Sequence, residues 1–485
     1  MKFKKHICVM LTTAMLVSLT ACGAGADKQE GNDSSVPTVS IYMPSTGDMS
    51  EAATVEAAIN EISEEKYGVK LSLNFIPIGN WNQQSNLLLT GDEADIMAIF
   101  NTPLSTFVNN GQLTDLTAYV DGASSEFHQV WTDEDLVGTS IGGAVYAIPN
   151  LRNFGNYYGL DIDEDIAAEF GIQDYQKWTM DDVSDFLYTV HEKYPDRYAL
   201  APQQASSMVQ GWSWDGLGDQ KSIGVLEDCG AEPVVKNLFD TDDFQNFCAY
   251  TRQWYEDGLV MPDALSNTEE IHALINADKA ISGFSNFANN ANAGSIHTVV
   301  VDAWTMSNSA QAFCYGINAN SKNPDAAWDA LEMLYIDSEI STLLTDGIEG
   351  KNYVKNDDGT ISYPEGKSAT DVGYSLAEVS WIPPYAGNTL PFDVNGPTYF
   401  TDLIDFNTNS AKSCAYGFVF DTSSVVDQYS ACSNIIDKYL NALMCGAVDT
   451  QSTIKQVNSE LEAAGINDII QEKQKQLDEY LGANK

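Results

Sequence analysis

Residues 39–100 read VSIYMPSTGDMSEAATVEAAINEISEEKYGVKLSLNFIPIGNWNQQSNLLLTGDEADIMAIF. Alternating apolar and polar residues are typical of a half-buried strand, and apolar residues at every third or fourth position are typical of an amphipathic helix. The two patterns, with one uninterrupted apolar run, predict a strand at 39–42, a helix at 51–66, a strand at 69–75, a helix at 82–89 and a strand at 95–100. This order predicts an α/β fold, with a parallel sheet and helices on both of its faces.

Ligands of such a sheet bind beyond the carboxyl ends of its strands. Polar or aromatic side chains follow each predicted strand: Ser45 follows the first, Trp81 the second and Asn101 the third. Because parallel strands end at the same edge of a sheet, we expect these three residues to contact a ligand.

The N-terminus predicts export. Residues 1–21 begin with three lysines and continue as an uncharged apolar stretch, shorter than the ~20 residues of a membrane span, which is typical of a signal peptide. The sequence Leu-Thr-Ala-Cys at 19–22 resembles a bacterial lipobox, so we expect cleavage before Cys22 and attachment of lipid to its thiol. Residues 22–37 are mostly small and polar, which predicts a flexible tether.

Length and charge limit the classes of partner. A chain of 485 residues is too long for one hydrophobic core, so two lobes are expected. Without residues 1–21 it keeps 21 basic and 69 acidic side chains, a formal charge of −48. That charge argues against nucleic acid and anionic membrane surfaces as partners, and solubility explains it better than cation binding does.

Cysteine usage indicates neither a zinc site nor a redox motif. Two of the eight cysteines, Cys8 and Cys22, belong to the predicted signal and its lipid attachment position. The other six are scattered and form no CxxC pair: Cys229, Cys248, Cys314, Cys414, Cys432 and Cys445. Export permits disulfides, but the spacing names no pair, and we expect free buried thiols.

Further motifs carry a family resemblance. They are GQLTDL at 111–116, GAVYAIP at 143–149, NPDAAW at 323–328 and LLTDGIEGKNY at 343–353. With the lipobox and the opening strands and helices, they resemble the extracellular solute-binding proteins of ABC importers, family 1 of sugar type, in a Gram-positive lipoprotein subgroup. Ala144 departs from the pattern, since lysine is common there. The resemblance covers most of residues 19–355, and none of its motifs identifies a ligand.

The resemblance implies a two-lobed, periplasmic-binding-protein-like α/β fold with a hinge and an interlobe cleft. The expected divisions are a first lobe of 38–150 plus 280–335, a second lobe of 151–279 plus 336–450, and a C-terminal helix at 451–485.

The resemblance also implies a role. The protein would be the substrate-binding component of an ABC transporter, capturing a carbohydrate, an oligosaccharide by expectation, through hinge closure and delivering it to permease subunits in the membrane. It would act as a monomer without enzymatic activity, cofactor or metal. Its N-terminal lipid would hold it on the extracellular face of the cell membrane of a Gram-positive bacterium.

Sugars stack their C–H faces on aromatic rings and pair their hydroxyls with polar side chains. Several aromatic residues lie in predicted loops or beside predicted strands, and an acidic side chain lies beside one of them. The candidates added on this ground are Tyr158, Trp212, Trp214, Asp302, Trp304, Trp381 and Tyr385.

Three alternatives stay open. A peptide- or other solute-binding lipoprotein would share the fold, and a surface glycan-active enzyme would need a pair of carboxylates that sequence cannot identify among 69 acids. The sequence has no Gly-x-Ser-x-Gly, HExxH or P-loop motif. Asp161–Asp165 is similar to a calcium loop, but Ile166 replaces its glycine and Ile172 its bidentate glutamate, which argues against a metal site there.

Overall fold

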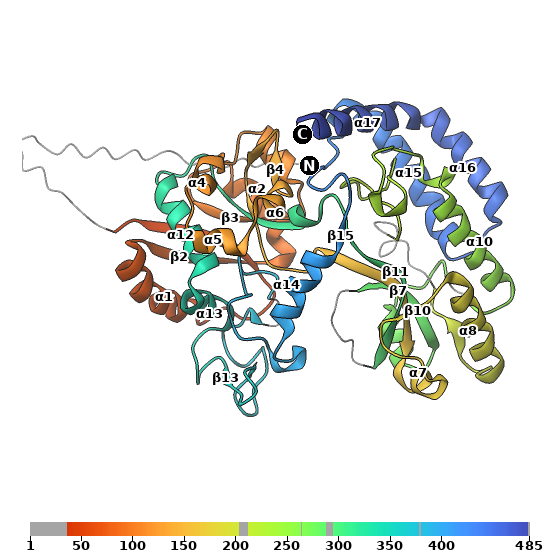
Figure 1. Cartoon of the computed structure of the whole chain (residues 1–485), viewed down its shortest axis with the longest axis horizontal. Coiled ribbons are helices and arrows are strands. Elements are labelled where there is room, and N and C mark those ends of the chain that lie inside the picture. Colours follow the sequence, from red (N-terminus) through yellow and green to blue (C-terminus); the bar gives the residue numbers. More distant parts are fainter. Residues whose placement is uncertain (1–35, 203–211, 263, 288–293, 378–379, 484–485) are drawn as a thin grey trace, which may run out of the picture. The chain divides into compact units, whose positions relative to one another are not determined.

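The structure, a computed structural model, consists of two α/β lobes built on separate β-sheets (Figure 1). It describes residues 36–202, 212–262, 264–287, 294–377 and 380–483. The predicted signal peptide and Cys22 therefore lie outside the described residues, as does nearly all of the predicted tether.

The first sheet confirms the parallel arrangement predicted from residues 39–100. Its strand order is β2-β1-β3-β12-β6, and β1 pairs in parallel with both β2 and β3. The strands are β1 (Thr38–Ser45), β2 (Lys70–Pro77), β3 (Ile96–Phe100), β6 (Ile148–Pro149) and β12 (Phe313–Ile317). Helices α1 (Ala52–Tyr67) and α2 (Trp81–Leu88) connect the parallel strands. β12 runs antiparallel to both of its neighbours, β3 and β6, so β6 points in the same direction as β1, β2 and β3.

Local sequence explains α1. Its Val55 and Ile59 are wholly buried against the sheet, as the apolar periodicity requires. The helix ends at Gly68, whose φ of 65° lies in the left-handed region and whose N–H donates to the carbonyl of Ser63. Only glycine adopts this conformation without strain, so the sequence itself determines where α1 ends.

The second sheet is mixed and centred on β7. Its order is β15-β11-β7-β10-β9, with β8 paired to β11, and β7 runs antiparallel to β10 and β11. The strands are β7 (Gly155–Asp163), β8 (Gln176–Lys177), β9 (Tyr198–Leu200), β10 (Ala280–Phe287), β11 (Ser295–Thr305) and β15 (Ala411–Lys412). Gly159 sits where β11 is irregular, and a Cβ there would come 1.7 Å from the carbonyl oxygen of Thr298, so only glycine fits.

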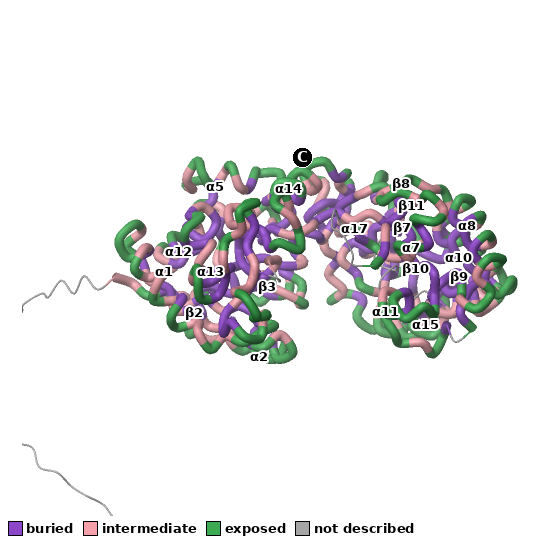
Figure 2. The backbone as a smooth tube through the Cα atoms, turned by 90° about the horizontal axis from the view of Figure 1, so that it is seen from below, coloured by how far each residue is buried: buried purple, intermediate pink, exposed green. Residues whose placement is uncertain are grey.

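Each lobe has its own hydrophobic core, and buried residues gather along its strands and the inner faces of its helices (Figure 2). The first core takes in α3 (Leu104–Asn109), α4 (Thr117–Asp121), α5 (Ser125–Val130), α6 (Asp133–Val137), α12 (Pro324–Ile336), α13 (Ser338–Asp346) and α14 (Tyr399–Asn409). The second takes in α7 (Glu164–Phe170), α8 (Met180–Lys193), α10 (Asp242–Glu256), α15 (Val426–Met444), α16 (Thr450–Ala464) and α17 (Ile466–Ala483). Smaller elements are α11 (Ile271–Asn276), which packs on β10, and the hairpins β4 (Ser140–Ile141) with β5 (Ala144–Val145) and β13 (Val354–Lys355) with β14 (Ile361–Ser362).

The expected lobe boundaries differ from the structure in two places. β10 (Ala280–Phe287) and β11 (Ser295–Thr305), expected in the first lobe, belong to the second sheet. Residues 336–403, expected in the second lobe, supply Ile340, Tyr374 and Leu403 to the first core. The physical reason is that strand pairing and core packing depend on partners more than 100 residues away, which local periodicity does not encode.

The C-terminal segment also differs from its expectation. The single helix expected at 451–485 is two helices, α16 and α17, separated at Gly465, whose φ is 95°. Both pack on the second core through buried residues such as Val457 and Leu477, so they belong to that lobe.

Cysteines and apolar helices give two further findings for the described residues. The six cysteines beyond Cys22 are all unpaired; four are buried, Cys229 is half-buried and Cys414 is exposed. None of the helices described is long and apolar enough to cross a membrane.

Candidate functional site

Three chain segments within the described residues connect the two lobes. The first, 150–154, leads from β6 to β7; the second, 306–312, leads from β11 to β12; and the third, 404–410, leads from the first core to β15. Such connecting segments are where lobes of this architecture bend.

Side chains fasten the connecting segments to one another. The amide of Asn407 donates from Nδ2 to the carbonyl of Arg152 (2.7 Å) and accepts at Oδ1 from the backbone N–H of Phe154 (2.8 Å). Gly155 allows a similarly close approach, since a Cβ there would lie 2.5 Å from Oγ of Ser410. These contacts hold the first and third connecting segments together. Their shared position therefore affects how a ligand beside them would bind.

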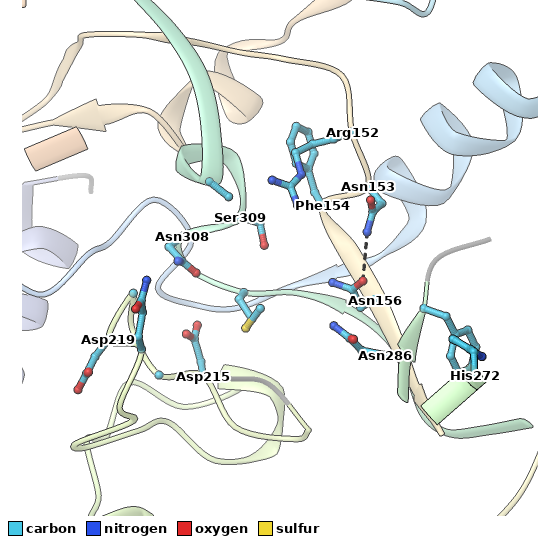
Figure 3. Close-up of a pocket in the computed structure, with 16 residues that line it drawn as sticks. Arg152, Asn153, Phe154, Asn156, Asp215, Asp219, His272, Asn286, Asn308 and Ser309 are labelled. Carbon is cyan, nitrogen blue, oxygen red and sulfur yellow. Dashed lines mark hydrogen bonds between the residues drawn. The ribbon is translucent and has the colours of Figure 1, made fainter. Parts of the chain in front are cut away.

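A cavity of about 530 Å³ opens at these segments (Figure 3). Its walls come from the first and second connecting segments, the ends of β7 and β10, α11, and a loop at 215–220. The lining residues are Arg152, Asn153, Phe154, Asn156, Asp215, Gly216, Gly218, Asp219, Gln220, His272, Asn286, Phe287, Met306, Asn308, Ser309 and Ala312. Most of these side chains are polar, and amides are the commonest type among them.

Asp215 joins the cavity loop to the second connecting segment. Its Oδ1 accepts from the backbone N–H of Leu217 (2.8 Å) and from Oγ of Ser307 (3.0 Å), and its Oδ2 accepts from the N–H of Ser307 (2.9 Å). The side chain is wholly buried, so these bonds compensate for the water that the carboxylate has lost. Asp215 therefore holds the loop at 215–220 against the second connecting segment.

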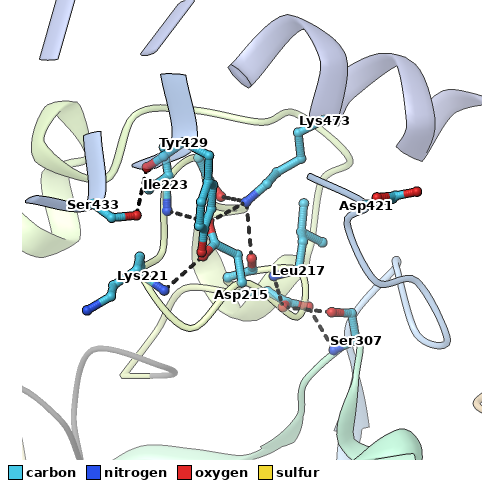
Figure 4. Close-up of polar contacts among 12 residues, drawn as sticks. Asp215, Leu217, Lys221, Ile223, Ser307, Asp421, Tyr429, Ser433 and Lys473 are labelled. Atoms are coloured by element: carbon cyan, nitrogen blue, oxygen red, sulfur yellow. Dashed lines mark hydrogen bonds and ion pairs between the residues drawn. The ribbon is translucent and has the colours of Figure 1, made fainter. Parts of the chain in front are cut away.

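A second buried carboxylate of the same loop, Asp219, is held by side chains of α15 and α17, among them Tyr429 and Lys473 (Figure 4). Asp219 accepts from Nζ of Lys473 on α17 (3.1 Å), from the hydroxyl of Tyr429 on α15 (2.6 Å), and from two backbone N–H groups of its own loop. Lys473 also donates to the carbonyls of Gly216 (3.3 Å) and Gly224 (2.9 Å). Burial lowers the pKa of the Lys473 ammonium, and the charge of Asp219 opposes that shift.

Amide side chains dominate the rest of the lining. Asn156 accepts at Oδ1 from Nδ2 of Asn153 (3.1 Å; Figure 3). Gln220, Asn286 and Asn308 have no side-chain hydrogen bond to any residue that the structure describes. An amide offers both donors and acceptors, so these groups suit a ligand rich in hydroxyls.

Apolar surface accompanies the amides. Phe154 and Phe287, which are 7% and 5% exposed, line the cavity together with Met306. Aromatic edges and faces of this kind pack against the C–H surfaces of a ligand, while the amides satisfy its polar groups.

A buried acid with two histidines borders the cavity. Asp161 accepts from or shares a proton with Nδ1 of His297 at 2.5 Å, and Nε2 of His272, which lines the cavity, lies 3.3 Å from its other oxygen. The His297 ring stacks on Phe287 at 4.1 Å. This cluster fixes the ring of Phe287 in the wall, and the described residues contain no group of three or more side chains that could hold a metal ion.

None of the ten candidates from sequence lines this cavity. Six belong to the cores or the first sheet and are at most 7% exposed: Ser45, Trp81, Tyr158, Trp212, Trp214 and Trp304. Trp212 and Trp304 form a core cluster with Tyr158, at ring distances of 6.4 and 6.5 Å from it, and the indole N–H of Trp304 donates to the carbonyl of Trp212 (3.2 Å). Burial of their large apolar area stabilises these aromatic side chains in the cores.

The other four candidates lie elsewhere. Tyr385 is 9% exposed and borders a smaller cavity of about 140 Å³, which it shares with Phe154. Trp381 is half-buried, and Asn101 and Asp302 are exposed. Asn101 follows β3 with a φ of 60°, and Asp302 forms an ion pair with Lys177 (2.6 Å).

The residues that do line the cavity carried weak sequence signals. Arg152, Asn153 and Asn156 form a polar run directly after an apolar strand, and Asp215 lies in the glycine-bounded loop that also contains Trp212. A polar run at the end of a strand was a usable signal. Sequence order alone, however, did not show that the two segments meet.

Comparisons with known proteins agree with this architecture. Residues 46–337 match the family described as bacterial extracellular solute-binding protein, and residues 414–482 match a domain of unknown function, DUF3502. A protein of Streptococcus pneumoniae serotype 4, named carbohydrate ABC transporter substrate-binding protein, is 22% identical over 97% of both chains.

Solved structures show the same fold. The N-glycan transport solute binding protein NgtS of S. pneumoniae has a TM-score of 0.77 at 20% identity and covers 93% of this chain and 100% of its own; it has also been solved with Man1GlcNAc. An extracellular solute-binding protein of Bifidobacterium longum subsp. infantis has a TM-score of 0.64 at 15% identity, covering 93% and 99%.

Proposed function

The chain belongs to the family of bacterial extracellular solute-binding proteins, and from that premise we propose that it binds a carbohydrate, an oligosaccharide, for an ABC importer. The observation that carries the proposal is the cavity of about 530 Å³ whose lining is rich in amide side chains, three of which have no hydrogen-bond partner among the residues that the structure describes. The carbohydrate ligands in the names of the similar proteins support the same substrate class.

Hydrogen bonding explains why this lining suits a sugar. Each ring hydroxyl both donates and accepts, and Gln220, Asn286 and Asn308 each provide both functions. Phe154 and Phe287 supply apolar surface for the C–H groups of the ring.

Delivery rests on movement about the connecting segments. A ligand that contacts both lobes stabilises the closed arrangement by the contacts it gains there, and the closed protein then docks on the permease. Asn101 and Trp381, which keep exposed surface on the first lobe, are the sequence candidates that we retain as contacts made on closure. The ring of Trp381 packs on Phe100 (5.9 Å) and Phe313 (5.6 Å), which fixes its position.

The family is extracellular, and the finer placement is part of the proposal. The lipobox-like sequence supports lipid attachment at Cys22, with the protein on the outer face of a Gram-positive cell membrane. We propose a monomer that binds its glycan without cleaving it, since the family is one of binding proteins.

The test is calorimetric titration of the mature chain, with Cys22→Ser to prevent acylation, against a panel of oligosaccharides. We expect saturable, micromolar binding of one glycan class and recovery of the glycan intact. Asn308→Ala should weaken that binding about tenfold, because it removes one donor and one acceptor. Asn434→Ala, on the exposed face of α15, is the matched control and should not. A glycan that is cleaved, or a panel in which only peptides bind, would contradict the proposal.

A further inference from the structure

One lining residue of the cavity differs from the others in charge. Arg152 lies in the first connecting segment, where its carbonyl accepts from Asn407 (2.7 Å), so its backbone is fixed. Its side chain is half-buried and lies across the cavity from Asp215 (Figure 3). The guanidinium therefore faces the space that a ligand would occupy.

Among the described residues, the guanidinium of Arg152 has no hydrogen-bond or ion-pair partner. The two other arginines of the sequence are both paired: Arg197 with Asp163 (2.8 Å), and Arg252 with Glu256 (2.5 Å). Burial lowers the pKa of Arg152, and no acidic group contributes an opposing shift. A guanidinium that has lost water without gaining a counter-charge is unfavourable unless an anion arrives.

The acids of the cavity do not supply that anion. Asp215 accepts three bonds from Leu217 and Ser307, and Asp219 is paired with Lys473 and Tyr429. Both carboxylates are turned to protein donors and hold the loop in place. The counter-charge of Arg152 would therefore have to come from the ligand.

We infer that the cavity takes a glycan that carries a carboxylate, with the guanidinium of Arg152 binding that carboxylate and the amides binding the neighbouring hydroxyls. The planar guanidinium matches a carboxylate with two parallel N–H···O bonds. A uronic acid unit and a terminal sialic acid share this chemistry. The inference rests on the proposed function and names the substrate class of the same site.

An acidic ligand would need a nearby cation to bind this protein. The mature chain carries a formal charge of −48, which repels an anionic glycan at long range. Attraction inside the cavity has to come from a group close to the ligand, where water and salt screen less.

The experiment compares matched glycan pairs on the mature Cys22→Ser chain by calorimetry. Oligogalacturonate is set against the corresponding neutral galactose oligomer, and sialyllactose against lactose, so that the two arms separate a uronic acid from a sialic acid. We expect the acidic member of one pair to bind at least tenfold tighter than its neutral partner.

Variants then assign the effect to the guanidinium. Arg152→Gln keeps hydrogen bonding but removes the charge, and should weaken the acidic glycan at least tenfold more than the neutral one; Arg152→Lys should retain part of the preference. Lys455→Gln makes the same change of net charge at an exposed position of α16 and should leave the preference unchanged. Circular dichroism and thermal unfolding verify that each variant is folded.

Other outcomes overturn the inference. The inference is wrong if the neutral and acidic glycans of each pair bind equally well, or if Arg152→Gln weakens the binding of both to the same extent. Arg152 would then bind hydroxyl groups rather than a carboxylate, and the proposed carbohydrate function would stand. If no glycan, acidic or neutral, binds the unaltered chain, the proposed function itself fails and the inference fails with it.

Discussion

Nζ of Lys473 lies 3.1 Å from Oδ2 of Asp219, and both side chains are at most 1% exposed. The lysine comes from α17 and the aspartate from the cavity loop, so a contact between residues 254 positions apart fixes a wall of the site. The C-terminal segment that matches a domain of unknown function therefore has a structural task in this protein: it supports the loop at 215–224.

Lys473→Met should destabilise the protein by about 3–5 kcal/mol, because it leaves the carboxylate of Asp219 buried without its cation. Urea unfolding measures this loss, and glycan affinity should fall with it as the loop moves. Lys475→Met, two residues along the same helix, removes only an exposed pair with Glu472 and is the control. Equal stability of the two variants would show that the buried pair does not support the loop.

Asn407→Ala should loosen the hinge side of the cavity. It removes both hydrogen bonds that hold the backbone of Arg152 and Phe154, at a cost of about 1–3 kcal/mol. We expect a lower midpoint of urea unfolding and a higher Kd for the glycan. Asn409→Ala is the control: this residue is exposed on the same helix, its amide donates to the carbonyl of Asp405, and its replacement should change neither.

Asp346 predicts a distinct pH dependence of stability. Its side chain is buried, neither oxygen has a partner among the described residues, and burial raises its pKa well above the ordinary value of 3.8. Above pH 3.8 the unfolded chain loses the proton while the folded chain keeps it. Stability therefore falls by about 1.4 kcal/mol for each pH unit from 3.8 up to the folded pKa.

Asp346→Asn removes this dependence. We expect the variant to unfold at a higher temperature than the unaltered protein at pH 7, with the advantage shrinking as the pH falls toward 4. Asp358→Asn is a control of opposite sign, because hydrogen bonds from Thr360 lower the pKa of that exposed carboxylate; its contribution is lost as the pH falls. A constant advantage of Asp346→Asn at all pH values would contradict the buried, protonated state.

Two tryptophans separate binding from packing. Trp381→Ala should weaken glycan binding about fivefold, because its half-buried ring is a proposed contact on lobe closure and stacking on an aromatic ring contributes on the order of 1 kcal/mol. Trp214→Phe alters a wholly buried ring that packs on Phe244, and should lower stability without changing affinity. Unchanged binding of Trp381→Ala would remove this residue from the site.

The sequence was a good guide wherever the physical cause was local. Periodicity placed β1, α1, β2, α2 and β3, and Gly68 ended α1 where the left-handed conformation was needed. The motifs identified the family that residues 46–337 match. These features depend on residues that are close in the sequence, so a short stretch of sequence contains the information that determines them.

The candidate cavity was not predicted from the sequence, and the reason is that its physical cause is not local. Trp81, Trp214 and Trp304 were expected to bind a ligand because they lie in loops or at strand ends, yet burial of their apolar area placed them in the cores. The cavity instead uses small polar residues, whose type says little until a ligand-facing position is known.

The family and the opening sheet thus follow from the sequence alone, since period, turn residues and motif order are local properties, and export stays a prediction from the N-terminus. Tertiary structure alone decided which sheet received β10 and β11, and which polar residues surround the cavity. Arg152, Asp215, Asn286 and Asn308 are distributed over more than 150 residues, and only the pairing of β7 with β10 and β11, together with the connecting segments, brings them to one place. Contacts between distant segments are set by the free energy of the whole fold, which no single stretch contains.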